Sequence, residues 1–224
     1  MSEKKRIFAF GSCRVQDNKY INHYVKGPPY DHCIKSVVQF IDFFENPNKW
    51  EELPTAAKKA IIWKPWRTFE QLKKWYDDAD IILVEISSLK LKMWNSISHA
   101  DWRLLRDGEE RKYRRQIRRN QTEQTYDDLI NDIKIVISKV NKPIIFQGHA
   151  NIIFNNIGKI KNRELIDNAI ISLVNCNNRI IISEIFGNEY NQEHWRDAGS
   201  SCHYSEKGYK LIADKFNEMI KNVI

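Results

Sequence analysis

Short, nearly continuous apolar runs alternate along the chain with longer stretches of helical periodicity, and this alternation most restricts the fold. The apolar runs are residues 6–10, a weaker 31–35, 80–86, 142–147 and 179–183. Runs without polar alternation are typical of strands covered on both faces, and strands separated by helices are typical of a parallel sheet. The sequence therefore predicts an α/β fold, a three-layer α/β/α sandwich.

Helical periodicity between the runs predicts helices over residues 36–44, 68–77, 109–139, 161–174 and 206–223. The 224 residues show no internal repeat and no linker-like change of composition, so we expect a single domain over residues 1–224. Residues 46–67 are rich in Trp and Pro and form an irregular excursion, either a lid or a packed segment. Residues 103–140 form a long basic helical region.

A good part of the net charge of +7 lies in residues 103–119 of this region, where residues 111–119 carry most of the cations. Such a helix either binds a polyanion or is a solvated face, since acidic residues flank it on both sides. We favour the solvated face and therefore expect no nucleic-acid partner. The sequence predicts no oligomeric state.

The chain contains no apolar run of membrane-spanning length and no signal-peptide core near its start, so we expect a cytoplasmic protein. Its four cysteines form no CxxC pair, which argues against a disulfide framework and a zinc site; we expect no metal.

The expected carboxyl ends of the strands carry small or polar residues, and ligands of open parallel sheets collect at that edge. The first strand leads into Gly11-Ser12-Cys13-Arg14. Ser12 lies on the expected turn before a helix, which suits a nucleophile, and His203 before the last helix is a candidate base. Asp197 is a candidate for the carboxylate that orients the imidazole.

These residues carry a family resemblance. Gly11-Ser12 after the first strand, together with His203 before a terminal helix that contains Gly208-Tyr209, resembles the SGNH/GDSL hydrolase superfamily. Within it, the chain is similar to a branch that opens with Gly-Ser-Cys rather than Gly-Asp-Ser, related to polysaccharide-biosynthesis proteins. The resemblance implies a flavodoxin-like sheet of strand order 2-1-3-4-5 and acyl chemistry without a metal.

The resemblance assigns the nucleophile to Ser12 and the base to His203. The family's acid lies three residues before the base, where this chain has Ser200, so either Asp197 replaces it or the enzyme uses a Ser–His dyad. Oxyanion donors in the family are the serine amide, a Gly after the second strand and an Asn after the third. At the corresponding expected positions this chain has His32 and the pair Ser87 and Ser88.

Two further residues, His149 and Asn151, follow the fourth expected strand and are candidates for substrate or oxyanion binding. Cys13 is either a small buried residue or the nucleophile of a transferase that uses an acyl-thioester, because related proteins are thought to use a cysteine in this turn. Arg14 either binds a substrate carboxylate or phosphate, or pairs with Asp17.

The sequence thus predicts a serine esterase or acyltransferase that acts on O-acyl groups, such as acetyl groups of a glycan. It needs no cofactor, although acyl-CoA is the candidate donor if the reaction is transfer. The alternative is a non-catalytic module on the same fold that binds an anionic ligand through its basic helix.

Overall fold

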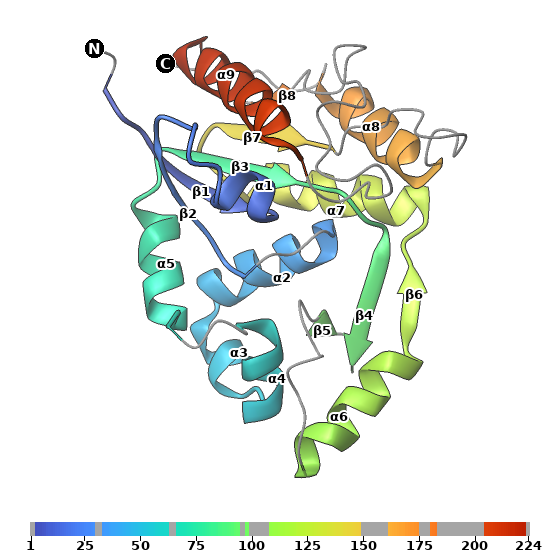
Figure 1. The fold of residues 1–224 in the computed structure, drawn as a ribbon. Helices are drawn as coiled ribbons and strands as arrows, with labels where there is room; N and C mark the ends of the chain where they lie inside the picture. The colour runs from blue at the N-terminus through green and yellow to red at the C-terminus, as the bar shows by residue number, and fades with distance from the viewer. Residues whose placement is uncertain are drawn as a thin grey trace.

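A computed structural model describes residues 3–29, 33–62, 66–94, 97–98, 108–148, 161–174, 180–182 and 204–222. Its centre is a five-stranded, wholly parallel sheet (Figure 1) in the order β2-β1-β3-β7-β8. The strands are β1 (Arg6–Phe10), β2 (Tyr24–Lys26), β3 (Ile81–Glu85), β7 (Ile144–Gln147) and β8 (Ile180–Ile182). Counted along the chain within this sheet, the order is 2-1-3-4-5, which confirms the predicted strand order.

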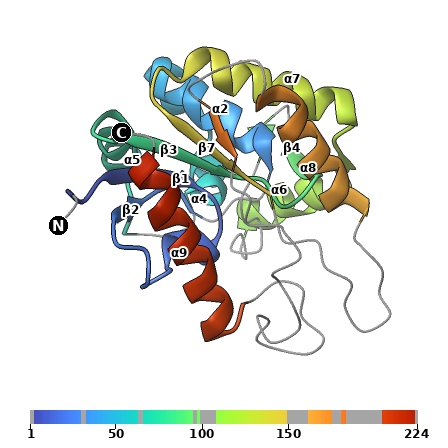
Figure 2. The ribbon, with the colours of Figure 1, turned by 90° about the horizontal axis from the view of Figure 1, so that it is seen from above.

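Helices cover both faces of this sheet, as Figure 2 shows for α2 and α7 on one side and α9 on the other. The described helices are α1 (Cys13–Gln16), α2 (Ile34–Glu45), α3 (Pro47–Glu51), α4 (Thr55–Ile61), α5 (Phe69–Asp77), α6 (Gly108–Arg119), α7 (Tyr126–Lys139), α8 (Lys161–Val174) and α9 (Glu206–Asn222). This arrangement confirms the three-layer α/β/α class.

The strands divide their side chains between two core clusters because successive residues point to opposite faces. On β1, Phe8 and Phe10 join the α2-side cluster, to which α5, α7 and α8 also contribute. Ile7 and Ala9 join the α9-side cluster, to which α1 contributes Val15. The central strands β1, β3 and β7 are almost wholly buried, as continuous apolar runs predict.

The predicted strand over residues 31–35 is wrong. Ile34 begins α2, whose apolar residues continue at helical spacing through Val37 and Ile41. The second strand is instead β2, a short edge strand that pairs in parallel with β1 and ends directly before Gly27. The only sequence signal for β2 was a short run with one β-branched residue, Val25, followed directly by Gly-Pro-Pro.

The predicted single helix over residues 109–139 is also wrong, because β6 (Gln121–Glu123) separates α6 from α7. β6 pairs with β4 (Lys90–Trp94), which also pairs with β5 (Ile97–Ser98), and the three form a small antiparallel sheet beyond β3. A capping box starts α7: the Asp128 N–H donates to the Thr125 hydroxyl, and the Asp128 side chain accepts from the Thr125 N–H.

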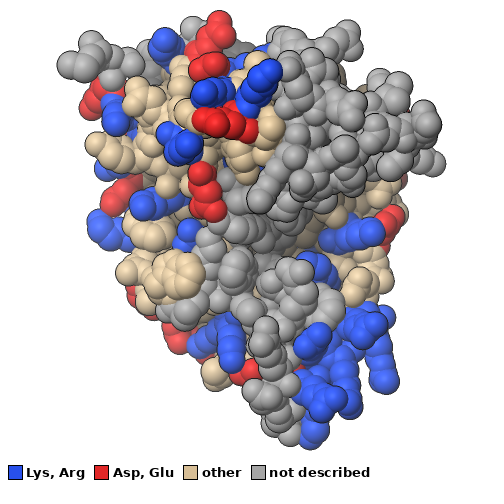
Figure 3. Space-filling view, viewed as in Figure 1, with Lys and Arg blue, Asp and Glu red and all other residues tan. Residues whose placement is uncertain are grey.

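The basic helix α6 packs through one face and exposes the other. Tyr113 and Ile117 are buried against Ala57 and Ala60 of α4, and burial raises the pKa of Tyr113. Lys and Arg side chains gather over α6 in the space-filling view (Figure 3). Across the described residues, no helix has the length and apolar character needed to cross a membrane.

The Trp- and Pro-rich segment contains α3 and α4, and Trp50 anchors it to the core. Its indole is 6% exposed and stacks on Phe69, with ring centroids 4.9 Å apart and an interplanar angle of 9°. Trp66, in contrast, is 68% exposed. Trp63 lies outside the described residues.

We expect Trp50→Ala to lower the free energy of unfolding by about 3–5 kcal/mol, since it removes a buried aromatic ring and leaves a cavity. Chemical denaturation monitored by circular dichroism measures the loss. Trp66→Ala is the matched control and should change stability by less than about 0.5 kcal/mol. Similar losses in both variants would show that Trp50 does not anchor the segment.

Candidate functional site

The turn between β1 and α1 lies at the carboxyl end of the first strand and holds Gly11 and Ser12. Gly11 is required there by close packing: a Cβ at this position would lie 2.9 Å from both Cβ and Oε2 of Glu85. A side chain would push the turn off the end of β3. The glycine therefore allows Ser12 to approach the neighbouring strand.

Glu85, the last residue of β3, is the polar centre of this site and is 2% exposed. Its Oε2 accepts the Ser12 N–H at 2.8 Å and the Ser12 hydroxyl at 2.7 Å. Its Oε1 accepts from Nε of Arg14 at 2.7 Å, and Nη2 of Arg14 pairs with the same oxygen. A buried carboxylate needs such donors and a counter-charge, and the turn supplies both.

The Ser12 hydroxyl is engaged on both sides, since it donates to Glu85 and accepts the N–H of Arg14 at 3.2 Å. Arg14 also reaches the loop after β3, where its Nη2 donates to the Ser87 hydroxyl at 3.2 Å. Ser12 and Arg14 are 2% and 4% exposed. The Ser12–Arg14–Glu85 cluster thus joins the ends of β1 and β3 into one rigid unit.

The side chain of Gln16 ties the same turn to the loop after β2. Its Nε2 donates to three carbonyl oxygens, those of Ala9 at 3.0 Å, Gly11 at 3.1 Å and Pro28 at 2.8 Å. One amide therefore fixes the backbone on both sides of the turn relative to the second strand.

Gly27, directly after β2, lies so close to β1 that a Cβ there would be 2.0 Å from the Ala9 carbonyl oxygen. Arg67 donates to the Gly27 carbonyl and to Oε1 of Gln16, which holds this loop in place. The residue that follows the second strand is therefore Gly27, and the expectation that His32 occupies that place is wrong because the strand was misplaced.

The end of β7 brings Gln147 beside Glu85, with which it is paired in register. Gln147 is 1% exposed, and in the described structure its Oε1 is buried without a hydrogen-bond partner. Gly148 follows, and a Cβ there would lie 2.2 Å from Oδ1 of Asp167 on α8. The carboxyl ends of three neighbouring strands thus carry Ser12, Glu85 and Gln147.

The start of α9 is held beside α1. Tyr204 is 2% exposed and belongs to the α9-side cluster together with Val15. Nδ2 of Asn18, just after α1, donates to the Tyr209 carbonyl at 2.9 Å. These contacts place the chain that directly follows position 203 next to the helix that begins at Cys13.

The structure brings Gly11, Ser12, Arg14 and Ser87 together as expected for one site. Ser88 instead shapes the entry to β4, since its hydroxyl accepts the Lys90 N–H at 3.0 Å. Cys13 is the first residue of α1 by its backbone, and its side chain lies outside the described part. Five further predicted site residues also lie outside it: His32, His149, Asn151, Asp197 and His203.

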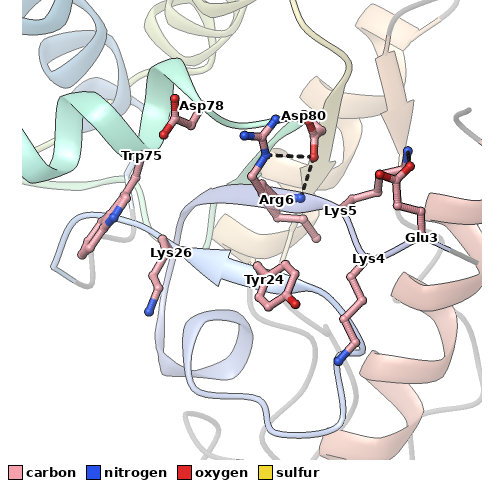
Figure 4. Close-up of a pocket in the computed structure, with 10 residues that line it drawn as sticks. Glu3, Lys4, Lys5, Arg6, Tyr24, Lys26, Trp75, Asp78 and Asp80 are labelled. Atoms are coloured by element: carbon pink, nitrogen blue, oxygen red, sulfur yellow. Dashed lines mark hydrogen bonds and ion pairs between the residues drawn. The ribbon is translucent and has the colours of Figure 1, made fainter.

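A separate cavity of about 480 Å³ lies at the opposite, amino edge of the sheet, lined in part by Arg6, Tyr24, Trp75 and Asp80 (Figure 4). Arg6 donates to Asp80 through its backbone N–H at 2.7 Å and through its guanidinium at 2.9 Å. This pairing lowers the pKa of Asp80 and raises that of Arg6. The cavity is therefore distinct from the turn that carries Ser12.

No family model and no curated protein matches the chain. Among solved structures it is similar to a Clostridium thermocellum family 3 carbohydrate esterase, with 10% identity, coverage of 99% and 98% of the two chains and a TM-score of 0.48. A Clostridium thermocellum family two carbohydrate esterase in complex with cellohexaose gives 9% identity, 99% and 65% coverage and a TM-score of 0.49. A mutant acetyl esterase with an acetate ion gives 12% identity, coverage of 97% of each chain and a TM-score of 0.43.

We expect Glu85→Gln to lower the free energy of unfolding by about 3–5 kcal/mol, because it leaves the buried Arg14 guanidinium without its counter-charge. Urea denaturation measures the effect. The matched control is Glu51→Gln, which breaks the exposed pair with Lys58 and should cost less than about 1 kcal/mol. An equally small effect at Glu85 would contradict the structural role of the cluster.

Proposed function

We propose that the protein is an esterase or acyltransferase that forms a covalent acyl intermediate on the turn after β1, with Cys13 as the nucleophile. One observation carries the proposal: the hydroxyl of Ser12 is buried and committed to Glu85 at 2.7 Å. A nucleophilic hydroxyl must give its proton to a base and a lone pair to the substrate. In this arrangement Glu85 holds the Ser12 proton, and the Arg14 N–H occupies one of the two lone pairs of the hydroxyl.

Cys13 is the next residue of the same turn, and a thiolate is a strong nucleophile for acyl groups. A count along the motif supports this choice. The serine of Gly-Asp-Ser stands two residues after the glycine, and two residues after Gly11 this chain has Cys13. The serine mechanism predicted from the sequence stays a prediction, and it requires Ser12 to leave Glu85 before attack.

In the proposed reaction, His203 takes the thiol proton and the thiolate of Cys13 attacks the acyl carbonyl carbon. The tetrahedral intermediate collapses, the bond to the leaving oxygen breaks, and that oxygen takes the proton from His203. Water or an acceptor hydroxyl then attacks the thioester and transfers its proton to His203. The C–S bond breaks, the acyl group leaves on the attacking oxygen, and the sulfur of Cys13 takes the proton back from His203. The contacts of Tyr204 and Asn18 support this pairing, since they hold the chain after His203 beside α1.

The oxyanion donors are part of the proposal. The Ser12 N–H already donates to Glu85 at 2.8 Å, so this amide is not available to a developing oxyanion. We propose the N–H groups of Cys13 and Gly27 instead, because backbone donors held in a fixed frame stabilise the charge of the transition state. Gln16 and Arg67 supply that frame.

The proposal is tested by intact-mass spectrometry after exposure to p-nitrophenyl acetate. We expect an acetyl adduct on the wild type that disappears in Cys13→Ala and persists in Ser12→Ala, although Ser12→Ala lowers the rate by about tenfold through loss of positioning. Cys33→Ala, which removes a buried cysteine directly before α2, is the matched control and should keep the adduct.

Two outcomes would contradict the proposal. An adduct that survives Cys13→Ala and disappears in Ser12→Ala would establish the serine mechanism. The absence of an adduct on every variant, including the wild type, would remove the covalent mechanism and favour a binding module.

The exposed face of α6 favours a second candidate function, the binding of an anionic polymer. Arg111, Arg115, Arg118 and Arg119 are exposed and lie opposite the buried face of the helix. None of the four has an ion-pair partner among the described residues, and the nearby Glu110 pairs with Lys59. Guanidinium groups match carboxylate and phosphate oxygens in a bidentate manner.

An acidic polysaccharide fits this face better than a single-stranded nucleic acid. Single-stranded nucleic acids are usually held by exposed aromatic rings, and the aromatic residue of α6, Tyr113, is buried. The helix thus offers cations without a stacking surface.

We expect the triple substitution of Arg111, Arg115 and Arg118 by Gln to weaken binding of polygalacturonate by about tenfold or more, because counter-charge is lost. Isothermal titration at two salt concentrations measures the affinity. A matched control replaces Lys49, Lys134 and Lys221 by Gln and should bind as the wild type does. Equal losses in both triples, or tight binding of an oligonucleotide in place of the polysaccharide, would contradict this function.

A further inference from the structure

Gln147 lies on the face of the sheet that carries the turn and α1. On β7, Phe146 belongs to the α2-side cluster and Ile145 to the α9-side cluster, so Gln147 points to the α9 side by alternation. Glu85 points to the same side, because Leu83 belongs to the α9-side cluster. Strands in register lie about 4.8 Å apart, which places Gln147 directly beside the Ser12–Arg14–Glu85 cluster.

Among the residues that the structure describes, the amide of Gln147 has no hydrogen-bond partner, although the residue is only 1% exposed. Its Oε1 is buried without a hydrogen bond, and no described residue bonds its Nε2. Other glutamines of the described chain do form such bonds: Gln16 uses Nε2 for three carbonyls, and Gln39 pairs with the backbone of Ser98. Buried polar groups in folded proteins are nearly always hydrogen-bonded, so an unpaired amide at a strand end needs a separate explanation.

Stability does not explain this residue, since a methionine of similar shape would fill the same space without an unpaired polar group. A hydrogen-bond partner that comes from outside the chain explains why the glutamine is there. An amide both donates and accepts, so it matches a group that also does both, which is a hydroxyl or a pair of neighbouring hydroxyls.

We infer that Gln147 binds a hydroxyl of the alcohol part of the substrate, next to the ester that Cys13 attacks. This inference rests on the proposed function and deepens it, because it names the substrate class as an acyl ester of a polyhydroxylated alcohol. A site that hydrogen-bonds a substrate hydroxyl discriminates strongly against analogues without one, since its own polar group is then left unpaired.

The test compares two acetyl esters in wild type and Gln147→Met. For mono-O-acetyl glucose, which has free hydroxyls, we expect kcat/KM to fall at least about tenfold, mainly through KM. For p-nitrophenyl acetate, which has none, we expect a change within about twofold. The thermal midpoint of unfolding of Gln147→Met should equal or exceed that of the wild type. If Gln147 had only a structural role, the substitution would lower this midpoint.

The matched control is Gln124→Met, because Gln124 is also buried with an unpaired Oε1 but lies beside Asp132, between β6 and α7. It should leave the ratio of the two substrates unchanged. The inference is overturned if Gln147→Met lowers the thermal midpoint clearly or affects both esters equally, or if it leaves glucose acetate unaffected. Failure of the wild type to hydrolyse or transfer either ester would instead refute the proposed function.

Discussion

The contact between the Glu85 carboxylate and the turn after β1 is the interaction on which the rest of the site depends. A buried carboxylate is stable only with donors and a counter-charge, and Ser12 and Arg14 supply them. The same contact explains why the preceding residue is Gly11, since no Cβ fits against Glu85. Three of the four residues of the Gly-Ser-Cys-Arg turn are thus explained by one side chain. Cys13 is the residue that this structural role does not explain, and it is the one to which we assign the chemistry.

Much of the fold could be predicted because burial on two faces leaves a strong pattern. β1, β3, β7 and the helix α8 lie within the predicted ranges, and the strand order agrees. β2 was missed because a three-residue edge strand is mostly exposed and buries too little apolar surface to show a pattern. The break between α6 and α7 was missed because both flanks are helical, although the Thr125 capping box was readable in the sequence.

The site was predictable in position but not in its polar partners. The turn with Ser12 was located because small residues follow a strong apolar strand. Glu85 was overlooked because it is the last residue of a strong apolar strand, yet a single acid in a continuously buried run needs a partner. Gln147, at the end of β7, is likewise a buried polar residue that needs a partner. The partner of Glu85 is Arg14, which lies four positions beyond β1 and is far from Glu85 in sequence, so only the fold shows this pairing. The assignments of His203 and the other residues outside the described part stay predictions.

The most direct test of this account is a crystal structure of the protein trapped after exposure to an acetyl donor. We predict a thioester on Cys13, with the Ser12 hydroxyl still within hydrogen-bonding distance of Oε2 of Glu85. An ester on the Ser12 oxygen, with the contact to Glu85 broken, would contradict the account.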